Sequence, residues 1–173
     1  AARTSKFGYS RRNFMQNTVR TNLASDDRDT EQKDLQNRIN QRIQEHIKIV
    51  NAGSTLLKVH LKSKGRANRF FKVVNNSFLR WGASEAALRN PRTCHSHHLS
   101  EILGIHYGNV TETFHKKHNR DLYPWTCFSL ILQKRTLDVV VQEDKVDSWV
   151  LGLAKLISFQ NPKAYVPSCG RYF

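Results

Sequence analysis

A run of cationic side chains without any acidic residue is the part of this sequence with the clearest chemistry. No Asp or Glu occurs between Lys48 and Arg80. Across residues 57–62 apolar side chains alternate with cationic ones, which predicts a strand with one apolar and one cationic face. A turn and a second strand follow, so several cations meet in one small volume, as in proteins that hold a phosphate without a metal. The candidate anion-binding residues are Lys58, His60, Lys62, Lys64, Arg66 and Arg69.

The overall charge points in the same direction. The 173 residues include 28 Lys and Arg against 14 Asp and Glu, a formal net charge of +14. This balance predicts a polyanionic partner, which is nucleic acid, an anionic membrane surface or an acidic protein. No apolar stretch is long enough to span a bilayer. The three scattered cysteines do not form a disulfide framework, so a reducing, cytosolic setting is expected.

The elements that would position these cations follow from the periodicity of the chain. Residues 1–33 are polar with little apolar periodicity, and we expect them to be flexible. A helix is predicted over 34–51, because apolar residues recur at four-residue steps from Leu35 to Ile47. It either packs on the domain that follows or lies on a membrane, and its narrow aliphatic stripe favours packing. The rest of the chain divides into a domain, 52–160, and a C-terminal tail, 161–173.

The domain is predicted to be mainly β. A polar loop is expected over 82–97 and one helical turn near 111–116. The last element is a helix starting near Asp144, which has the spacing of an N-cap with Asp147. Its apolar face includes Trp149, so we expect a bent sheet or partial barrel closed at one end by this helix. The predicted strands are Thr55–Ser63, Arg69–Val74, Ser77–Trp81, His98–Tyr107, Thr126–Gln133 and Arg135–Gln142.

Several motifs in this order resemble a pleckstrin-homology (PH) domain, most closely those of phosphoinositide-specific phospholipase C. The resemblance covers residues from about 52 to 159 and implies a partial barrel of about seven antiparallel strands, capped by a C-terminal helix and here preceded by another helix. A small chain of this kind also resembles the acylated PH-domain proteins of apicomplexan parasites. The motifs are Gly53-Ser-x-Leu-Leu-Lys58-Val, Arg69-Phe-x-Lys-Val, Leu99-x-Glu-Ile102-x-x-Ile105-x-x-Gly108, Cys127-Phe-Ser-Leu-Ile, Thr136-Leu-Asp-Val and Trp149-Val-Leu-Gly-Leu-x-Lys-x-Ile157.

The resemblance assigns roles to the cationic hairpin. In phospholipase C type PH domains, basic residues of the first two strands and their loop hold the head-group phosphates. Lys58 and Arg69 match that set, and His60 stands where the family has a second lysine. Thr136 matches a hydroxyl contact. The loop cations are Lys62, Lys64 and Arg66.

One departure from the family bears on the ligand. The family places a further lysine against the inositol ring, where this chain has Ala86 and Ala87. A single phosphomonoester fits the remaining cations better than a polyphosphorylated ring. The resemblance thus implies a non-catalytic sensor of phosphatidic acid on the cytoplasmic face of a secretory organelle, acting in regulated secretion, in a family anchored by myristate and palmitate. A phosphoinositide-binding PH domain, or a PH-fold module that binds acidic proteins, is the alternative.

Other classes of function receive less support. Nucleic-acid binding is disfavoured because base-stacking aromatic residues are not interleaved with the basic hairpin. Cys94, His95, His97 and His98 lack a second pair of zinc ligands at a recognised spacing, so a polar loop is their expected role. The chain has no glycine-rich phosphate loop, nucleophile elbow or zinc-protease motif, so we expect no enzyme, no metal and no cofactor. The expected partner is an anionic phospholipid membrane, bound by a monomer.

A second basic cluster has two interpretations. Lys116, Lys117 and Arg120 either add to a membrane-facing surface or belong to a solvated loop. Aromatic residues flank this cluster. They are Phe114, Tyr123 and Trp125, and insertion of some of them into the lipid interface is one interpretation. Trp125 directly precedes an apolar strand, so we expect it in the core.

Overall fold

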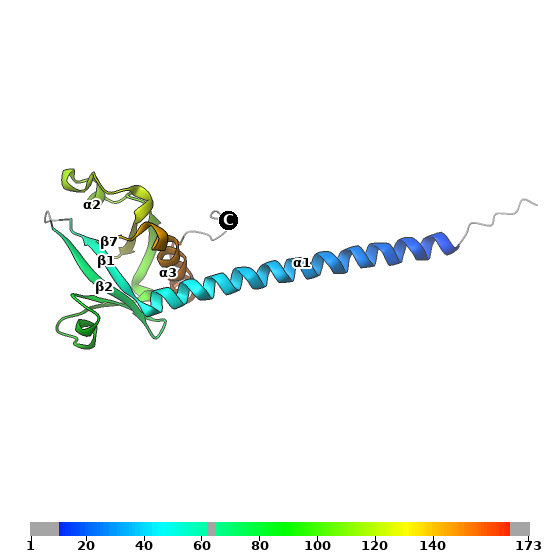
Figure 1. The fold of residues 1–173 in the computed structure, drawn as a ribbon, viewed down its shortest axis with the longest axis horizontal. Helices are drawn as coiled ribbons and strands as arrows, with labels where there is room; N and C mark the ends of the chain where they lie inside the picture. Colours follow the sequence, from blue (N-terminus) through cyan, green and yellow to red (C-terminus); the bar gives the residue numbers. More distant parts are fainter. Residues whose placement is uncertain (1–10, 62–64, 167–173) are drawn as a thin grey trace, which may run out of the picture. The chain divides into compact units, whose positions relative to one another are not determined.

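The computed structural model describes residues 11–61 and 65–166 of the chain. The chain divides into two units, one that ends at Gln41 and one that begins at Arg42. The described part of the first unit is helical, and the second unit contains the whole sheet (Figure 1). Among the described residues, no helix is both long and apolar enough to cross a bilayer.

Helix α1 extends from Arg11 to Ala52, so it begins well inside the segment expected to be flexible. Neither Gly nor Pro occurs between its ends, and nothing in the backbone chemistry stops a helix there. Gly53 ends it with a φ of +81°, and its N–H donates to the carbonyl of Ile49 at 3.0 Å. Within the second unit the last turns of α1 pack on the domain, since Val50 is fully buried in the main core.

Seven antiparallel strands form one open sheet in the order β4-β3-β2-β1-β7-β6-β5, which confirms the predicted fold class. β4 and β5 are its two edges. The segment predicted as one strand over His98–Tyr107 is divided, because the His98 ring accepts a hydrogen bond from the Ser100 N–H and the chain turns there. The strands are β1 Ser54–Val59, β2 Arg66–Val74, β3 Phe78–Gly82, β4 His95–His98, β5 Ile102–Tyr107, β6 Cys127–Leu132 and β7 Thr136–Val140.

Short helical segments fill the connections. The helical turn predicted near 111–116 is present as α2, Glu112–His115. The polar loop predicted over 82–97 contains a short 3-10 helix and the first three residues of β4. The 3-10 segments are η1 Ala86–Arg89, η2 Leu99–Glu101, η3 Lys117–Asn119, η4 Pro124–Thr126 and η5 Glu143–Lys145.

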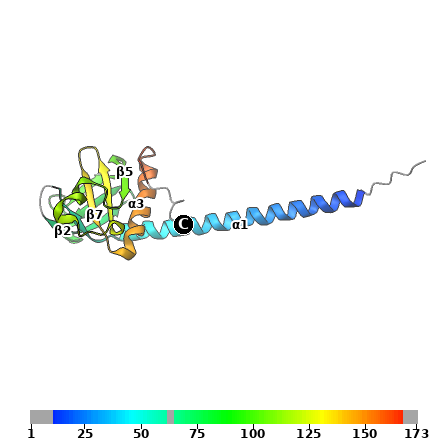
Figure 2. The same ribbon diagram turned by 90° about the horizontal axis from the view of Figure 1, so that it is seen from above.

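Helix α3, Val146–Gln160, covers the main core (Figure 2). Trp149 is buried as predicted, and its indole N–H donates to the Ser54 hydroxyl at 3.0 Å. A Cβ on Gly152 would lie 2.7 Å from Val50 of α1, so this glycine allows the two helices to approach closely. The predicted cap was wrong: Lys145 occupies the N-cap position, because the 3-10 turn of η5 leads the chain into the helix.

A second, smaller core lies on the opposite face of the sheet from the main one. Val59, Phe114 and Cys127 form it, beneath the long connection between β5 and β6. Because successive strand residues point to opposite faces, Leu56 belongs to the main core and Val59 to this smaller one. Trp125 was expected in a core but is 47% exposed, because η4 turns the chain before β6 begins.

Candidate anion-binding site at the open end of the sheet

The cationic face of β1 points to the same side of the sheet as the main core. Lys58 shares this face with buried Leu56, two residues earlier, and His60 continues it. Arg69 of β2 is in register with Leu56, and directly paired residues project to one face. Val59, on the other face of β1, instead lies under the β5–β6 connection. Lys58, His60 and Arg69 are therefore brought together beyond the edge of the core.

A pocket of about 530 Å³ forms where β1 and β7 separate. The two strands pair only as far as Val59 and Asp138. The residues that follow Val59 and those that precede Asp138 line the pocket. Lys58 and His60 line one wall. Lys134 and Arg135, from the turn between β6 and β7, line the other. These last two cations were not among the predicted residues.

Mutual repulsion shows that the cations are close together. Burial lowers the pKa of the Lys58 ammonium, and the positive charges of Arg135 and Arg69 lower it further. Burial also lowers the pKa of His60, followed by repulsion from Lys58 and Arg69. An anion bound in the pocket would raise the pKa values of Lys58 and His60. Clustered cations that lower one another's pKa are typical of anion-binding sites.

Two histidines of β4 lie near these cations. His95 and His97 stack on the buried ring of Trp81, with centroids 5.3 and 5.6 Å away. The pKa of His95 is lowered by burial and then by Lys58, Arg135 and Arg69, in that order. The sequence contained a signal for this contact, since alternation in a strand places His95 and His97 on one face. The cluster was instead interpreted as a polar loop, in preference to a zinc site. Within the described residues, no three His, Cys, Asp or Glu side chains come together as a metal site.

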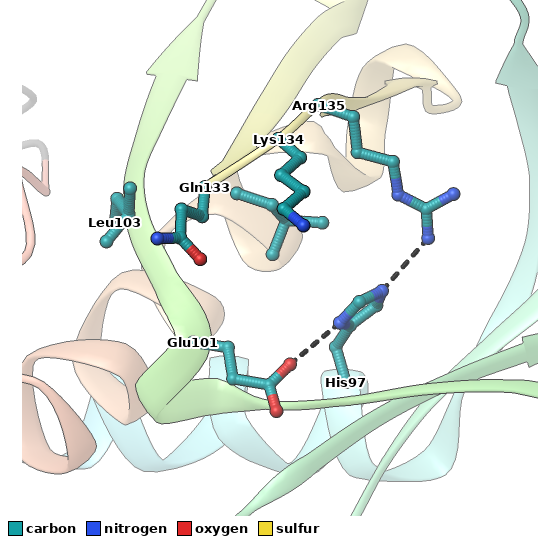
Figure 3. A pocket seen from close by; sticks show the side chains of 7 residues that line it. His97, Glu101, Leu103, Gln133, Lys134 and Arg135 are labelled. Carbon is teal, nitrogen blue, oxygen red and sulfur yellow. Dashed lines mark hydrogen bonds and ion pairs between the residues drawn. The ribbon is translucent and has the colours of Figure 1, made fainter.

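A chain of hydrogen bonds crosses the open end of the sheet (Figure 3). Arg135 donates to Nε2 of His97 at 2.9 Å, and Nδ1 of His97 lies 2.8 Å from Glu101. Since a guanidinium only donates, Nε2 accepts and the ring proton is on Nδ1, directed at the carboxylate. A more apolar pocket of about 700 Å³ lies beside this chain, with Leu103 and Leu132 in its wall. Arg135 thus belongs to both pockets.

Arg66 does not belong with the other cations. It lies on the opposite face of β2 from Arg69 and binds the β5–β6 connection. Its guanidinium donates to Asp121 at 2.9 Å, to the Asn119 side chain at 3.2 Å and to the His118 carbonyl. The hydrogen bond with Asp121 raises the pKa of Arg66, so this guanidinium is already paired with a carboxylate. The interpretation of Arg66 as a head-group ligand stays a prediction, and this ion pair does not favour it.

The remaining predicted residues are placed as follows. Thr136 lines the pocket, but its hydroxyl donates to Asp138 at 2.6 Å. Lys62 and Lys64 lie outside the described residues. Ala86 is exposed in η1, and no residue of the described segment between β3 and β4 lines the pocket.

Asp138 is the one carboxylate among the described residues that line the pocket. It is buried, and four hydroxyl groups donate to it at 2.6 to 2.7 Å. Both oxygens are thus occupied, and the carboxylate is oriented toward the β5–β6 connection. The donors are Thr111, Thr113, Ser129 and Thr136.

Comparisons with known proteins give matches among solved structures. No family model and no curated protein matches the sequence. Among solved structures, PLC21 from S. officinalis superposes with a TM-score of 0.51 at 13% identity, over 64% of this chain and 16% of that one. Inner membrane complex sub-compartment protein 3 from Toxoplasma gondii gives a TM-score of 0.49 at 13% identity, over 69% of this chain and 86% of its own.

The N-terminal PH domain of human ARAP2 gives a TM-score of 0.49 at 15% identity, over 68% of this chain and 88% of that domain. The domain has a seven-stranded antiparallel sheet and a C-terminal helix, and it superposes on PLC21. Together these show that the second unit of the chain has the PH-domain fold.

Proposed function

We propose that this protein is a non-catalytic module that recognises an anionic phospholipid head group at a cytoplasmic membrane surface. The observation that carries the proposal is the convergence of Lys58, Arg69 and Arg135 at the open end of a PH fold. Burial, and then the charges of Arg135 and Arg69, lower the pKa of Lys58, whereas Asp138 raises it. None of the ion pairs between described residues includes these three cations. Because holding cations together costs stability, such an arrangement is better explained by a ligand than by folding.

Phosphatidic acid is the lipid that this site suits best. Its phosphomonoester presents a compact, divalent group, which a few Lys and Arg side chains hold through charge-assisted hydrogen bonds. The segment with Ala86 supplies no cation to the pocket, so a ring with several phosphates would leave some of them without a partner. His60 and His95 add charge only when protonated. We accordingly assign a lipid-sensing role on a secretory organelle, with a phosphoinositide as the second candidate ligand.

The second candidate has one observation in its favour. Lys134 lies at the rim beside Arg135, so two adjacent cations on the β6–β7 turn face the pocket opening. A second phosphate on a ring could reach them. Recognition of an acidic protein by the same cations is a third interpretation, and the lipid experiment below distinguishes it.

The test is flotation with phosphatidylcholine vesicles that carry phosphatidic acid, phosphatidylserine or phosphatidylinositol bisphosphate at matched total charge. We expect phosphatidic acid to retain the most protein. Lys58→Gln, Arg69→Gln and Arg135→Gln should each weaken retention roughly tenfold, the effect of losing one charge-assisted contact. Lys155→Gln, an exposed lysine of α3, is the charge-matched control. Preference for the bisphosphate would shift the assignment to phosphoinositides, and retention that follows only net charge would refute a specific site.

A further inference from the structure

We propose that the stacked rings of Tyr123 and Trp125 form a second membrane contact, which inserts into the head-group region of the bilayer beside the cationic pocket. The two residues lie in the connection between β5 and β6 and take no part in the pocket. This inference rests on the proposed function, because it assumes that the protein works at a membrane surface.

The rings are exposed although their backbone is held firmly. Tyr123 is 62% and Trp125 47% exposed, and the ring centroids are 4.9 Å apart with an interplanar angle of 17°. The Thr126 hydroxyl donates to the Tyr123 carbonyl at 2.8 Å, and the Tyr107 hydroxyl donates to the Trp125 carbonyl at 2.9 Å. A contact made by such a prearranged pair loses little conformational entropy.

The connection that carries this pair is attached to the cationic hairpin. Arg66, the first residue of β2, binds Asn119 and Asp121, only a few residues before Tyr123. Deeper in the same connection, Phe114 and Leu122 pack against Val59 of β1. The aromatic pair is therefore part of the same folded unit as the pocket.

The charges around the pair favour a lipid surface as its partner. Lys117 and Arg120 are exposed in the same connection. The two acidic residues there are already paired, Glu112 with Lys116 at 2.6 Å and Asp121 with Arg66. Tyr and Trp concentrate at membrane interfaces because each has an apolar body and a polar group that stays hydrated. Exposed cations beside them add attraction to anionic lipids.

Tryptophan fluorescence isolates this contact. The chain has three Trp residues, and Trp81 and Trp149 are fully buried, so Trp125 is the one that lipid can reach. The full chain is mixed with phosphatidylcholine–phosphatidic acid vesicles whose acyl chains are brominated near the glycerol, a quencher of indole emission. We expect quenching in the unmodified protein and none in Trp125→Phe.

Binding strength supplies an independent readout. The double variant Tyr123→Ser/Trp125→Ser should partition into phosphatidic acid vesicles roughly tenfold less, from the loss of apolar contact area. Phe159→Ser removes an aromatic side chain of α3 that is 82% exposed, and serves as the control that leaves partitioning unchanged. Near-UV circular dichroism verifies that each variant keeps its folded core.

The outcomes separate the two proposals. Vesicle binding without quenching of Trp125, or with unchanged partitioning of the double variant, overturns the aromatic contact and leaves the head-group site standing. No binding to any anionic vesicle refutes the proposed function, and the aromatic contact with it.

Discussion

Arg135 donates a hydrogen bond to Nε2 of His97 at 2.9 Å, and this contact joins the β6–β7 turn to edge strand β4 across the open end of the sheet. It places a guanidinium between the cationic pocket and the apolar one. A phosphate bound by Lys58 and Arg69 would lie next to Arg135, whose charge already depresses the pKa of Lys58. The contact explains how a residue distant in sequence from the hairpin contributes to its anion site.

Binding should strengthen as the pH falls. The pKa values of His60 and His95 are lowered in the free protein, and a bound anion raises them, so protonation is coupled to binding. The charged groups that face these rings are Lys58, Arg69 and Arg135, with His97 beside His95. Vesicles with a sulfate-bearing lipid, whose charge does not change, should bind more tightly at about pH 5.5 than at about pH 7.5. The double variant His60→Asn/His95→Asn should lose this dependence, and an unmodified protein with flat binding would contradict the account.

The same histidines make the opposite contribution to the stability of the free protein. Their folded pKa is below the unfolded value, so the unfolded state takes up more protons as the pH falls through about 6.5. Stability without ligand should therefore decrease in acid over this range. Urea unfolding at several pH values measures the effect, and the double Asn variant provides the baseline.

Lys58→Met should stabilise the protein while it weakens binding. The Lys58 ammonium is partly buried beside Arg135 and Arg69, and methionine keeps the length of the side chain without the charge. We expect a gain of up to about 1 kcal/mol in the free energy of unfolding. Urea denaturation measures it, with Lys155→Met as the control. A clear loss of stability would show that Lys58 has a structural role that this account does not include.

Arg66 should matter for the β5–β6 connection and not for the head group. The Asp121 side chain of this ion pair is largely exposed, so a double-mutant cycle with Arg66→Gln and Asp121→Asn should give only a small coupling that decreases further as salt is added. Binding of a soluble head group, glycerol phosphate, should be unchanged in Arg66→Gln and weakened in Arg69→Gln. Equal losses in both variants would restore Arg66 to the site.

Asp138→Ala should be among the most destabilising substitutions in the domain. It leaves four hydroxyl groups that now donate to Asp138 without that acceptor, at a cost of about 3 kcal/mol or more. Asp138→Asn keeps one acceptor oxygen, and hydroxyl groups can turn to accept from its amide, so its cost should be smaller. Thermal unfolding of the two variants gives this order, and similar stability for both would argue against the hydroxyl cluster.

The sequence predicted the sheet and the terminal helix well, because alternation along strands and the apolar stripe around Trp149 are local patterns. It also predicted that Lys58, His60 and Arg69 lie close together, whereas their role in binding stays a prediction. It did not predict Arg135 and His95, whose place depends on the pairing of β1 with β7 and on the path of edge strand β4.

The positions of Arg66 and Trp125 were harder to predict, for a related reason. Both residues depend on the β5–β6 connection, whose packing on β1 no periodicity reveals. In the sequence Arg66 stands next to the predicted turn and was grouped with the cations of that turn. The pairing of β1 with β2 places Arg66 on the opposite face of the sheet from Arg69. Trp125 precedes an apolar strand, but η4 separates it from that strand.

Chemical-shift mapping with a short-chain, monomeric phosphatidic acid tests the central claim most directly. The account predicts saturable shifts at Lys58, His60, Arg69, His95 and Arg135, together with a rise in the pKa of Lys58, and no comparable shift at Arg66 or along α3. Shifts confined to other surfaces, or the absence of saturable binding at the open end of the sheet, would contradict it.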